Sequence, residues 1–126
     1  MGITIQEASR NSGLSAHTLR YYERIGLIHP VERSVSGHRV YTEPDLDWLV
    51  FLTRLRSTGM PIADMCHYAE LRRRGPETFA ERRRILADHR ERVRGRITRL
   101  TEDLGVLDTK IEMYDTSETH DTREQS

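Results

Sequence analysis

The sequence predicts a mainly α-helical protein: a winged helix-turn-helix head, followed by one long helix that pairs with a second chain. Two short helical segments joined by a turn at Gly13 precede a basic turn at Gly37. Farther along, apolar residues recur in a strict heptad pattern from Val93 to Tyr114. Only 36% of the residues are hydrophobic and 32% are charged, a balance that suits a small core with long solvated helices.

The first helix is expected over residues 6–11. Thr4 and Glu7 fit a capping box, in which each side chain accepts a hydrogen bond from the backbone of the other. Ala8 falls on the predicted inner face, and Gly13 stops the helix. Leu14 and Ser15 then make a tight connection to a second helix, so the pair has the helix-turn-helix pattern.

The second helix is expected over residues 16–25. Ser15 can cap its start, and Gly26 can end it in the left-handed conformation that glycine adopts without strain. Leu19 and Tyr22, three apart, are expected to face the core. The remaining positions carry long polar or aromatic side chains: His17, Thr18, Arg20, Tyr21 and Arg24. A polar helix of this kind can enter the major groove of DNA.

A basic hairpin follows, with two short strands expected at residues 27–28 and 39–41 around the turn at Ser36-Gly37. The chain as a whole has a formal net charge of zero. Residues 10–39, however, contain five arginines and two glutamates, so this window carries 5 − 2 = +3. We therefore expect binding to nucleic acid to be focused on one patch and to weaken as salt rises.

Two further helices complete the head. Thr42 can cap the third helix, with Pro44 tolerated in its first turn, and Gly59 ends it. The fourth runs from Pro61 to about Arg74. Gly75-Pro76 then breaks the chain, so the sequence divides into a DNA-binding domain at 1–75, a dimerisation helix at 76–114 and a disordered tail at 115–126 that lacks apolar residues.

The long helix is expected to be the dimerisation element. Its apolar residues step alternately by four and three: Val93, Ile97, Leu100, Leu104, Leu107, Ile111 and Tyr114. Ile97, Leu104 and Ile111 occupy a positions of the heptad and the others d positions. A single helix cannot bury such a seam by itself, so the sequence predicts a helical partner, with no direction specified.

The lone cysteine, Cys66, excludes an intramolecular disulfide and a thiolate-only metal site within one chain. It is a candidate redox sensor, but a free cysteine more often packs as a small hydrophobe, which is the reading favoured here. We expect no metal site, no cofactor and no enzymatic activity, because the sequence has neither a Gly-rich phosphate loop nor an HExxH pattern. It also has no signal peptide or membrane-spanning run, which predicts a cytoplasmic protein.

The segment HTLRYYERIGLI, followed by SGHRVYTEPDLDWLVFLTRLRSTGMPIADM, closely resembles the MerR family of bacterial transcription regulators over residues 3–75. The resemblance implies a homodimer in which two long helices pair antiparallel and hold two heads on a palindromic promoter operator. It further implies that the dimer, in response to an effector, bends and untwists the DNA so that RNA polymerase can engage the promoter.

The resemblance also implies which residues contact DNA. His17 and Thr18, on the first turn of the second helix, are the candidates for sequence choice, and Arg20 and Tyr21 follow them. Wing and backbone contacts would come from Arg33, His38, Arg39, Tyr41 and Arg54, with Tyr41 also having a structural role. Metal-sensing members usually carry paired cysteines after the dimerisation helix, and this sequence has none there.

The sequence therefore predicts a DNA-binding regulator whose partners are double-stranded promoter DNA, a second copy of the chain, RNA polymerase and a small-molecule effector. The alternative is an architectural or coiled-coil interaction protein whose DNA head binds without switching transcription. The effector, the operator, the target genes and the direction of regulation are left open by the sequence.

Overall fold

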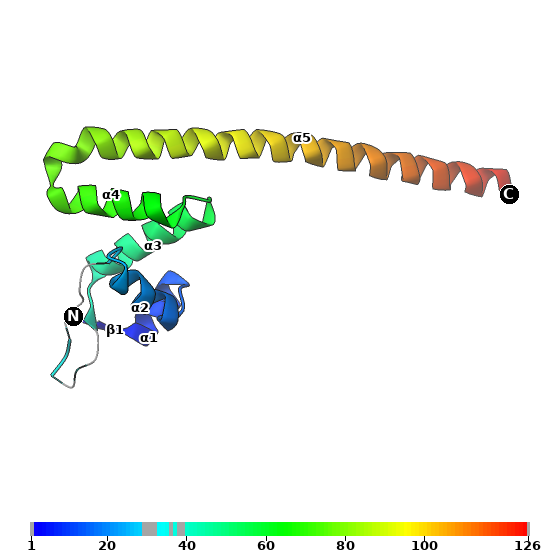
Figure 1. The fold of residues 1–126 in the computed structure, drawn as a ribbon. Coiled ribbons are helices and arrows are strands. Elements are labelled where there is room, and N and C mark those ends of the chain that lie inside the picture. Colours follow the sequence, from blue (N-terminus) through cyan, green and yellow to red (C-terminus); the bar gives the residue numbers. More distant parts are fainter. Residues whose placement is uncertain (1, 29–32, 36, 38–39, 126) are drawn as a thin grey trace. The chain divides into compact units, whose positions relative to one another are not determined.

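The computed structural model describes residues 2–28, 33–35, 37 and 40–125, with side chains as far as Glu118. The chain forms two compact units, Met1–Ala87 and Asp88–Ser126. In chain order the elements are β1 (Ile3–Thr4), α1 (Ile5–Ser12), α2 (Ala16–Arg24), β2 (Val40–Tyr41), α3 (Glu43–Ser57), α4 (Ile62–Arg74), the 3₁₀ turn η1 (Pro76–Thr78) and α5 (Phe79–Gln125) (Figure 1). The mainly helical class predicted from the sequence is confirmed.

The two helices of the helix-turn-helix form where their caps predict them. The Thr4 hydroxyl accepts from the Glu7 backbone N–H at 3.2 Å, which starts α1. Gly13 ends α1 with a φ of 78°, and its N–H donates to the Ser9 carbonyl. The Ser15 hydroxyl then accepts from the Thr18 N–H at 3.1 Å and starts α2. Both helices therefore lie within a residue or two of the predicted bounds.

The end of α2 is a turn and not the start of a strand, which corrects the strand expected at residues 27–28. Gly26 has a φ of 85°, and the N–H groups of Leu27 and Ile28 both donate to the Tyr22 carbonyl, at 2.9 and 3.3 Å. Their side chains are buried in the core. Because the helix end uses both donors, neither remains for strand pairing.

The small sheet joins the start of the chain to the entry of α3. β1 pairs antiparallel with β2, with Ile3 opposite Tyr41 and Thr4 opposite Val40. The predicted strand at residues 39–41 thus has its described part, β2, beside β1. Thr42 follows at once and forms a complete capping box with Asp45, so the same segment ends the sheet and starts α3.

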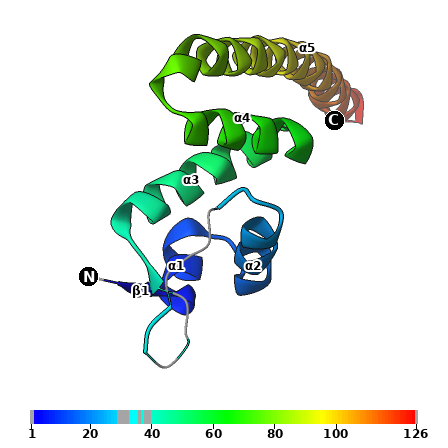
Figure 2. The ribbon, with the colours of Figure 1, turned by 60° about the vertical axis from the view of Figure 1, so that its left-hand side comes forward.

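The head packs around one hydrophobic core, to which α1, α2, α3 and α4 all contribute (Figure 2). Its largest fully buried side chains include Tyr41, Leu19, Leu27, Leu49 and Met65. Across the core, the indole N–H of Trp48 on α3 donates to the Leu27 carbonyl at 2.8 Å. This bond joins the end of α2 to the middle of α3.

α5 begins at Phe79 and extends to Gln125 over 47 residues. Its last part differs from the disorder that composition predicts for residues 115–126, because the backbone of residues 115–125 continues the helix. No proline or glycine follows Gly105, so nothing in the sequence stops the helix there. In the described residues, no helix combines the length and hydropathy needed to span a membrane.

We expect Trp48→Phe to lower the free energy of unfolding by about 1–3 kcal/mol, because it leaves the buried Leu27 carbonyl without its donor. Urea denaturation followed by circular dichroism measures the change. Tyr21→Phe is the matched control, since that ring is 38% exposed and lies outside the heptad seam. Equal stability of Trp48→Phe and the unsubstituted chain would show that the bond contributes nothing to the head.

Candidate nucleic-acid interface

The exposed face of α2 is the centre of the candidate interface. His17, Arg20, Tyr21 and Arg24 lie at positions i, i+3, i+4 and i+7, which places them on one side of the helix, and all four are exposed. Leu19 and Tyr22 lie on the other side and are buried. We call the exposed set the α2 face. The burial of its opposite side fixes which residues the helix presents outward.

Arg24 belongs to the α2 face, although it was not among the residues predicted from the sequence to contact DNA. Its guanidinium lies 5.6 Å from the centre of the Tyr21 ring, a cation–π distance. The i+7 spacing from His17 was the signal in the sequence that identifies it. This contact holds two candidate DNA-contacting side chains against each other.

Thr18 lies differently from its neighbours. It is half-buried, and its hydroxyl accepts a hydrogen bond from the Ser15 hydroxyl at 2.9 Å. The same Ser15 oxygen caps the helix, so the Thr18 side chain is part of the cap network. His17 and Thr18 are both predicted to determine which operator sequence is bound, and His17 is the more accessible of the two.

The wing is described only in part. Arg33 is exposed and donates to the Gly37 carbonyl at 3.0 Å, and Gly37 has a φ of 85°. This bond closes the turn and keeps a guanidinium at its surface. The predicted contacts from His38 and Arg39 lie outside the described residues.

Tyr41 requires a correction. The sequence places it among the DNA-contacting residues, but its side chain is 0% exposed and belongs to the core. Its neighbour Val40 on β2 is only half-buried, so Tyr41 is the residue of this strand that packs into the core. A side chain with no accessible surface cannot reach a phosphate, so we leave Tyr41 out of the proposed interface.

Two arginines near the end of α3 differ in their bonding. Arg56 donates to the Met60 carbonyl at 3.2 Å and thereby supports the turn into α4. Arg54 is exposed, and its guanidinium has no hydrogen-bond or ion-pair partner among the described residues. Nearby, burial raises the pKa of the Tyr22 phenol above its ordinary value, and the positive charge of Arg56 partly offsets the rise. Arg54 thus remains a candidate for a phosphate contact.

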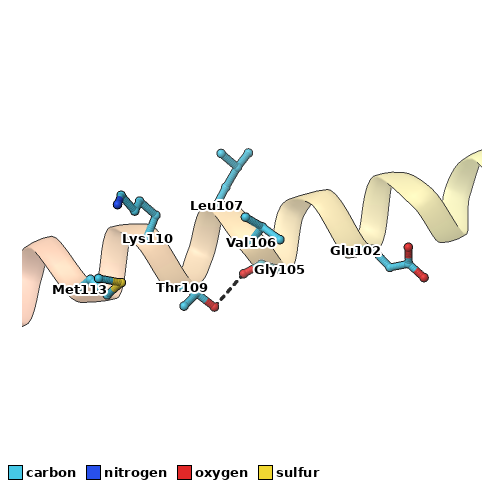
Figure 3. Close-up of a pocket in the computed structure, with 7 residues that line it drawn as sticks. All are labelled: Glu102, Gly105, Val106, Leu107, Thr109, Lys110 and Met113. Carbon is cyan, nitrogen blue, oxygen red and sulfur yellow. Dashed lines mark hydrogen bonds between the residues drawn. The ribbon is translucent and has the colours of Figure 1, made fainter.

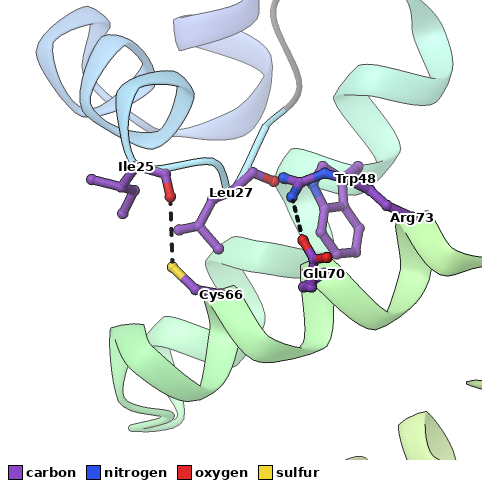
Figure 4. Close-up of polar contacts among 6 residues, drawn as sticks. All are labelled: Ile25, Leu27, Trp48, Cys66, Glu70 and Arg73. Carbon is purple, nitrogen blue, oxygen red and sulfur yellow. Dashed lines mark hydrogen bonds and ion pairs between the residues drawn. The ribbon is translucent and has the colours of Figure 1, made fainter.

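Cys66 is half-buried on α4. Its sulfur lies 4.0 Å from the Ile25 carbonyl at the end of α2 (Figure 4). Among the residues that the structure describes, no three His, Cys, Asp or Glu side chains come close enough together to hold a metal ion. The thiol therefore packs between α4 and the end of α2.

The heptad seam on α5 presents a row of apolar side chains. Six of the seven predicted seam residues are between 56% and 66% exposed: Ile97, Leu100, Leu104, Leu107, Ile111 and Tyr114. Val93, the first of the seven, is half-buried. Exposed apolar rows of this length indicate an interaction surface.

Comparison with known proteins agrees with these features. A family model described as "MerR HTH family regulatory protein" matches residues 3–70, and one described as "MerR, DNA binding" matches residues 46–109. The HTH-type transcriptional regulator AdhR of Bacillus subtilis is 43% identical over 91 residues, which cover 72% of this chain and 65% of AdhR, just under two thirds of its length. An uncharacterized HTH-type transcriptional regulator of Haemophilus influenzae is 35% identical over 114 residues, covering 90% of this chain and 84% of the relative.

Two solved structures are similar over most of both chains. A MerR family transcriptional regulator from Listeria monocytogenes is 43% identical with a TM-score of 0.84, covering 90% of this chain and 86% of its own. HiNmlR, a MerR family regulator lacking the sensor domain and bound to promoter DNA, is 34% identical with a TM-score of 0.84, covering 94% of each chain. With a family model that matches more than half of its residues and such relatives, the chain belongs to the MerR family of DNA-binding transcriptional regulators.

Proposed function

We propose that this regulator binds a palindromic promoter operator as a homodimer and changes transcription in response to an effector. The observation that carries the proposal is the α2 face, which gathers four polar or aromatic side chains on the exposed side of the helix that follows a helix-turn-helix turn. The fold supports it, since a similar regulator of the same family was solved on promoter DNA. The family is one of transcription regulators and not of enzymes.

On DNA, the residues of the α2 face have different tasks. His17 lies on the first turn, where recognition helices reach base edges, so we assign it to sequence choice together with Thr18. Arg20, Tyr21 and Arg24 follow toward the C-terminal end of the helix, where side chains reach the phosphate backbone. Arg33 on the wing, His38, Arg39 and Arg54 are proposed to grip phosphates outside the groove.

The seam on α5 is proposed as the dimer interface, with the two helices antiparallel. Its support is the exposure of the apolar row, whose burial against an identical row would be favourable at about 25 cal/mol per Å². A two-fold dimer carries two heads, which matches a palindromic site. Bending the DNA between the heads is the proposed way in which the effector-bound state lets RNA polymerase engage the promoter.

We expect Leu104→Glu to convert the dimer to a monomer, because it places an unpaired charge in the middle of the apolar seam. Sedimentation at micromolar concentration measures the mass. Leu104→Met, which keeps the position apolar, is the control and should remain dimeric. A Leu104→Glu variant with an unchanged dimer mass would exclude the seam as the interface.

We expect Arg24→Ala to weaken binding to all DNA sequences and to make the plot of log affinity against log salt shallower by about 0.9, the contribution of one phosphate. His17→Ala should instead change the ranking of operator variants. Fluorescence anisotropy over a salt series and an operator library measures both. Arg83→Ala, an exposed arginine on α5, is the control. If Arg24→Ala kept both affinity and salt slope, the α2 face would not contact phosphate.

We expect Cys66→Ser to leave the response to the effector intact, because the thiol packs between α4 and the end of α2. Promoter activity in cells with equal protein abundance measures the response. Loss of the response to an aldehyde, quinone or oxidant, with operator binding retained, would instead make Cys66 the sensor.

The test of the whole proposal is a footprint on the regulator's own promoter, positioned against the −35 and −10 elements, together with transcript levels. A protected palindrome between these elements and a transcript change in cells that carry the protein support an effector-switched regulator. Protection without any transcript change under any tested inducer would favour an architectural DNA-binding protein.

A further inference from the structure

The joint between α4 and α5 is held by hydrogen bonds around the Thr78 side chain. Thr78 is 4% exposed, and its hydroxyl oxygen lies 2.7 Å from the Leu71 carbonyl oxygen and 2.8 Å from the Gly75 carbonyl oxygen. A hydroxyl has one hydrogen, so the two carbonyls share it. Leu71 is one of the last four residues of α4, whose carbonyls have no partner within the helix. The Thr78 hydroxyl therefore ties the end of α4 to the start of α5.

Arg82, in the first turn of α5, completes this network. Its Nε donates to the Thr78 hydroxyl oxygen at 2.9 Å, and its Nη2 donates to the Gly75 carbonyl at 3.2 Å. Its guanidinium carbon lies 4.5 Å from the centre of the Phe79 ring, a cation–π distance. A planar guanidinium that binds two acceptors and a ring allows little variation in geometry. The joint is thus held in one direction and not merely packed.

Gly75 supplies the backbone conformation that the network needs. Its φ of 101° and ψ of −169° lie in a region that glycine alone adopts without strain. A Cβ at this position would lie 3.1 Å from the Glu77 Oε2. The Gly75 carbonyl also accepts from the Thr78 backbone N–H, at 3.1 Å. The chain turns back at this joint, so that α4 and the start of α5 lie side by side (Figures 1 and 2).

Further contacts hold the first turns of α5 against the head. Ile85 and Leu86 pack on the hydrophobic core, and the His67 Nε2 on α4 lies 3.5 Å from the Glu81 Oε1. All of these residues belong to the same compact unit as the head. The sequence from residue 79 to residue 94 has no glycine or proline, the residues at which helices usually kink. The direction in which the chain leaves the head is therefore set at the joint.

The joint is also the connection between each head and the seam. The proposed DNA contacts end at Arg54 and the seam begins at Val93, so the chain passes from one to the other through the joint. In a dimer joined at the seam, the distance between the two heads depends on the direction in which each α5 leaves its head. We propose that Thr78 and Arg82 are positioning residues that fix this direction and thereby select the spacing between the two half-sites of the operator. The inference rests on the two-headed dimer of the proposed function.

Half-site spacing is a property that the joint can discriminate. Each base pair inserted between two half-sites moves them apart by about 3.4 Å and rotates one against the other by about 34°. Heads on rigid joints cannot follow this rotation without breaking contacts, so the affinity falls. Heads on joints that have lost their hydrogen bonds follow it at lower cost. The α2 face reads each half-site separately and cannot supply this selectivity.

Thr78→Val tests the proposal, because it keeps the shape of the side chain and removes the hydroxyl. The DNA probes are the palindrome protected in the footprint, versions with one or two base pairs inserted at its centre, and a single half-site. Fluorescence anisotropy measures the affinities. We expect Thr78→Val to bind the half-site like the unsubstituted chain, to bind the natural palindrome several-fold more weakly and to lose less affinity with each inserted base pair. Thr78→Ser, which keeps a hydroxyl, should restore the original profile.

Thr109→Val is the matched control. The Thr109 hydroxyl is exposed on α5 and donates to the Gly105 carbonyl of the same helix at 3.0 Å (Figure 3). Thr109 falls at an f position of the heptad, away from the seam, so its substitution should leave the spacing profile unchanged.

Arg82→Met is the second variant, and it carries the test if Thr78→Val does not fold. Methionine keeps an unbranched stem beside Phe79 but has no N–H groups to donate. We expect it to flatten the spacing profile as Thr78→Val does. The combined variant should change the profile by less than the sum of the two, because both substitutions remove the bond between Arg82 and Thr78.

Two results would overturn the positioning role. One is an unsubstituted chain that prefers one spacing, with the same profile in Thr78→Val and Arg82→Met. The other is an equal loss of affinity for the half-site and for every spacing, since these residues would then only stabilise the head. An unsubstituted chain that binds the single half-site as tightly as the palindrome would instead disprove the two-headed dimer, and the role of the joint with it.

Discussion

The hydrogen bond from the Trp48 indole to the Leu27 carbonyl lies where the parts of the head meet. Leu27 ends the turn that closes α2, and Trp48 lies in the middle of α3, so the bond fixes α2 against the rest of the head. The α2 face points outward because the other side of the same helix is held in this core. The orientation of the candidate DNA-contacting residues therefore depends on packing that includes this bond.

The helix starts could be predicted because caps are local. The hydroxyls of Thr4, Ser15 and Thr42 each accept from a backbone N–H three residues on, and short spacing in the sequence suffices to reveal such a contact. The partner of β2 could not be predicted, since Ile3 and Tyr41 lie 38 residues apart and their pairing depends on the tertiary fold. The burial of Tyr41 in the core likewise depends on the tertiary fold, so the sequence did not reveal it either.

The sequence predicted which residues belong to the candidate site better than it predicted how accessible their side chains are. His17, Arg20 and Tyr21 are exposed as the helical pattern predicts, but whether a hydroxyl such as that of Thr18 is available depends on the cap that it joins. The helical period assigns Arg24 to the α2 face once the buried side of α2 is known. The hollow lined by Trp48, Tyr68 and Leu86 could not be predicted from the sequence, because these residues come from three different helices and meet only in the folded head.

α5 carries two apolar surfaces on different sides, and each has a different physical requirement. The a and d positions need a second helix of matching heptads to bury their apolar side chains, which is why we propose them as the dimer interface. The c positions hold Val106 and Met113, which are 70% and 56% exposed and lie outside the a and d positions. The c positions need no partner of their own, because apolar side chains scattered singly are common on protein surfaces.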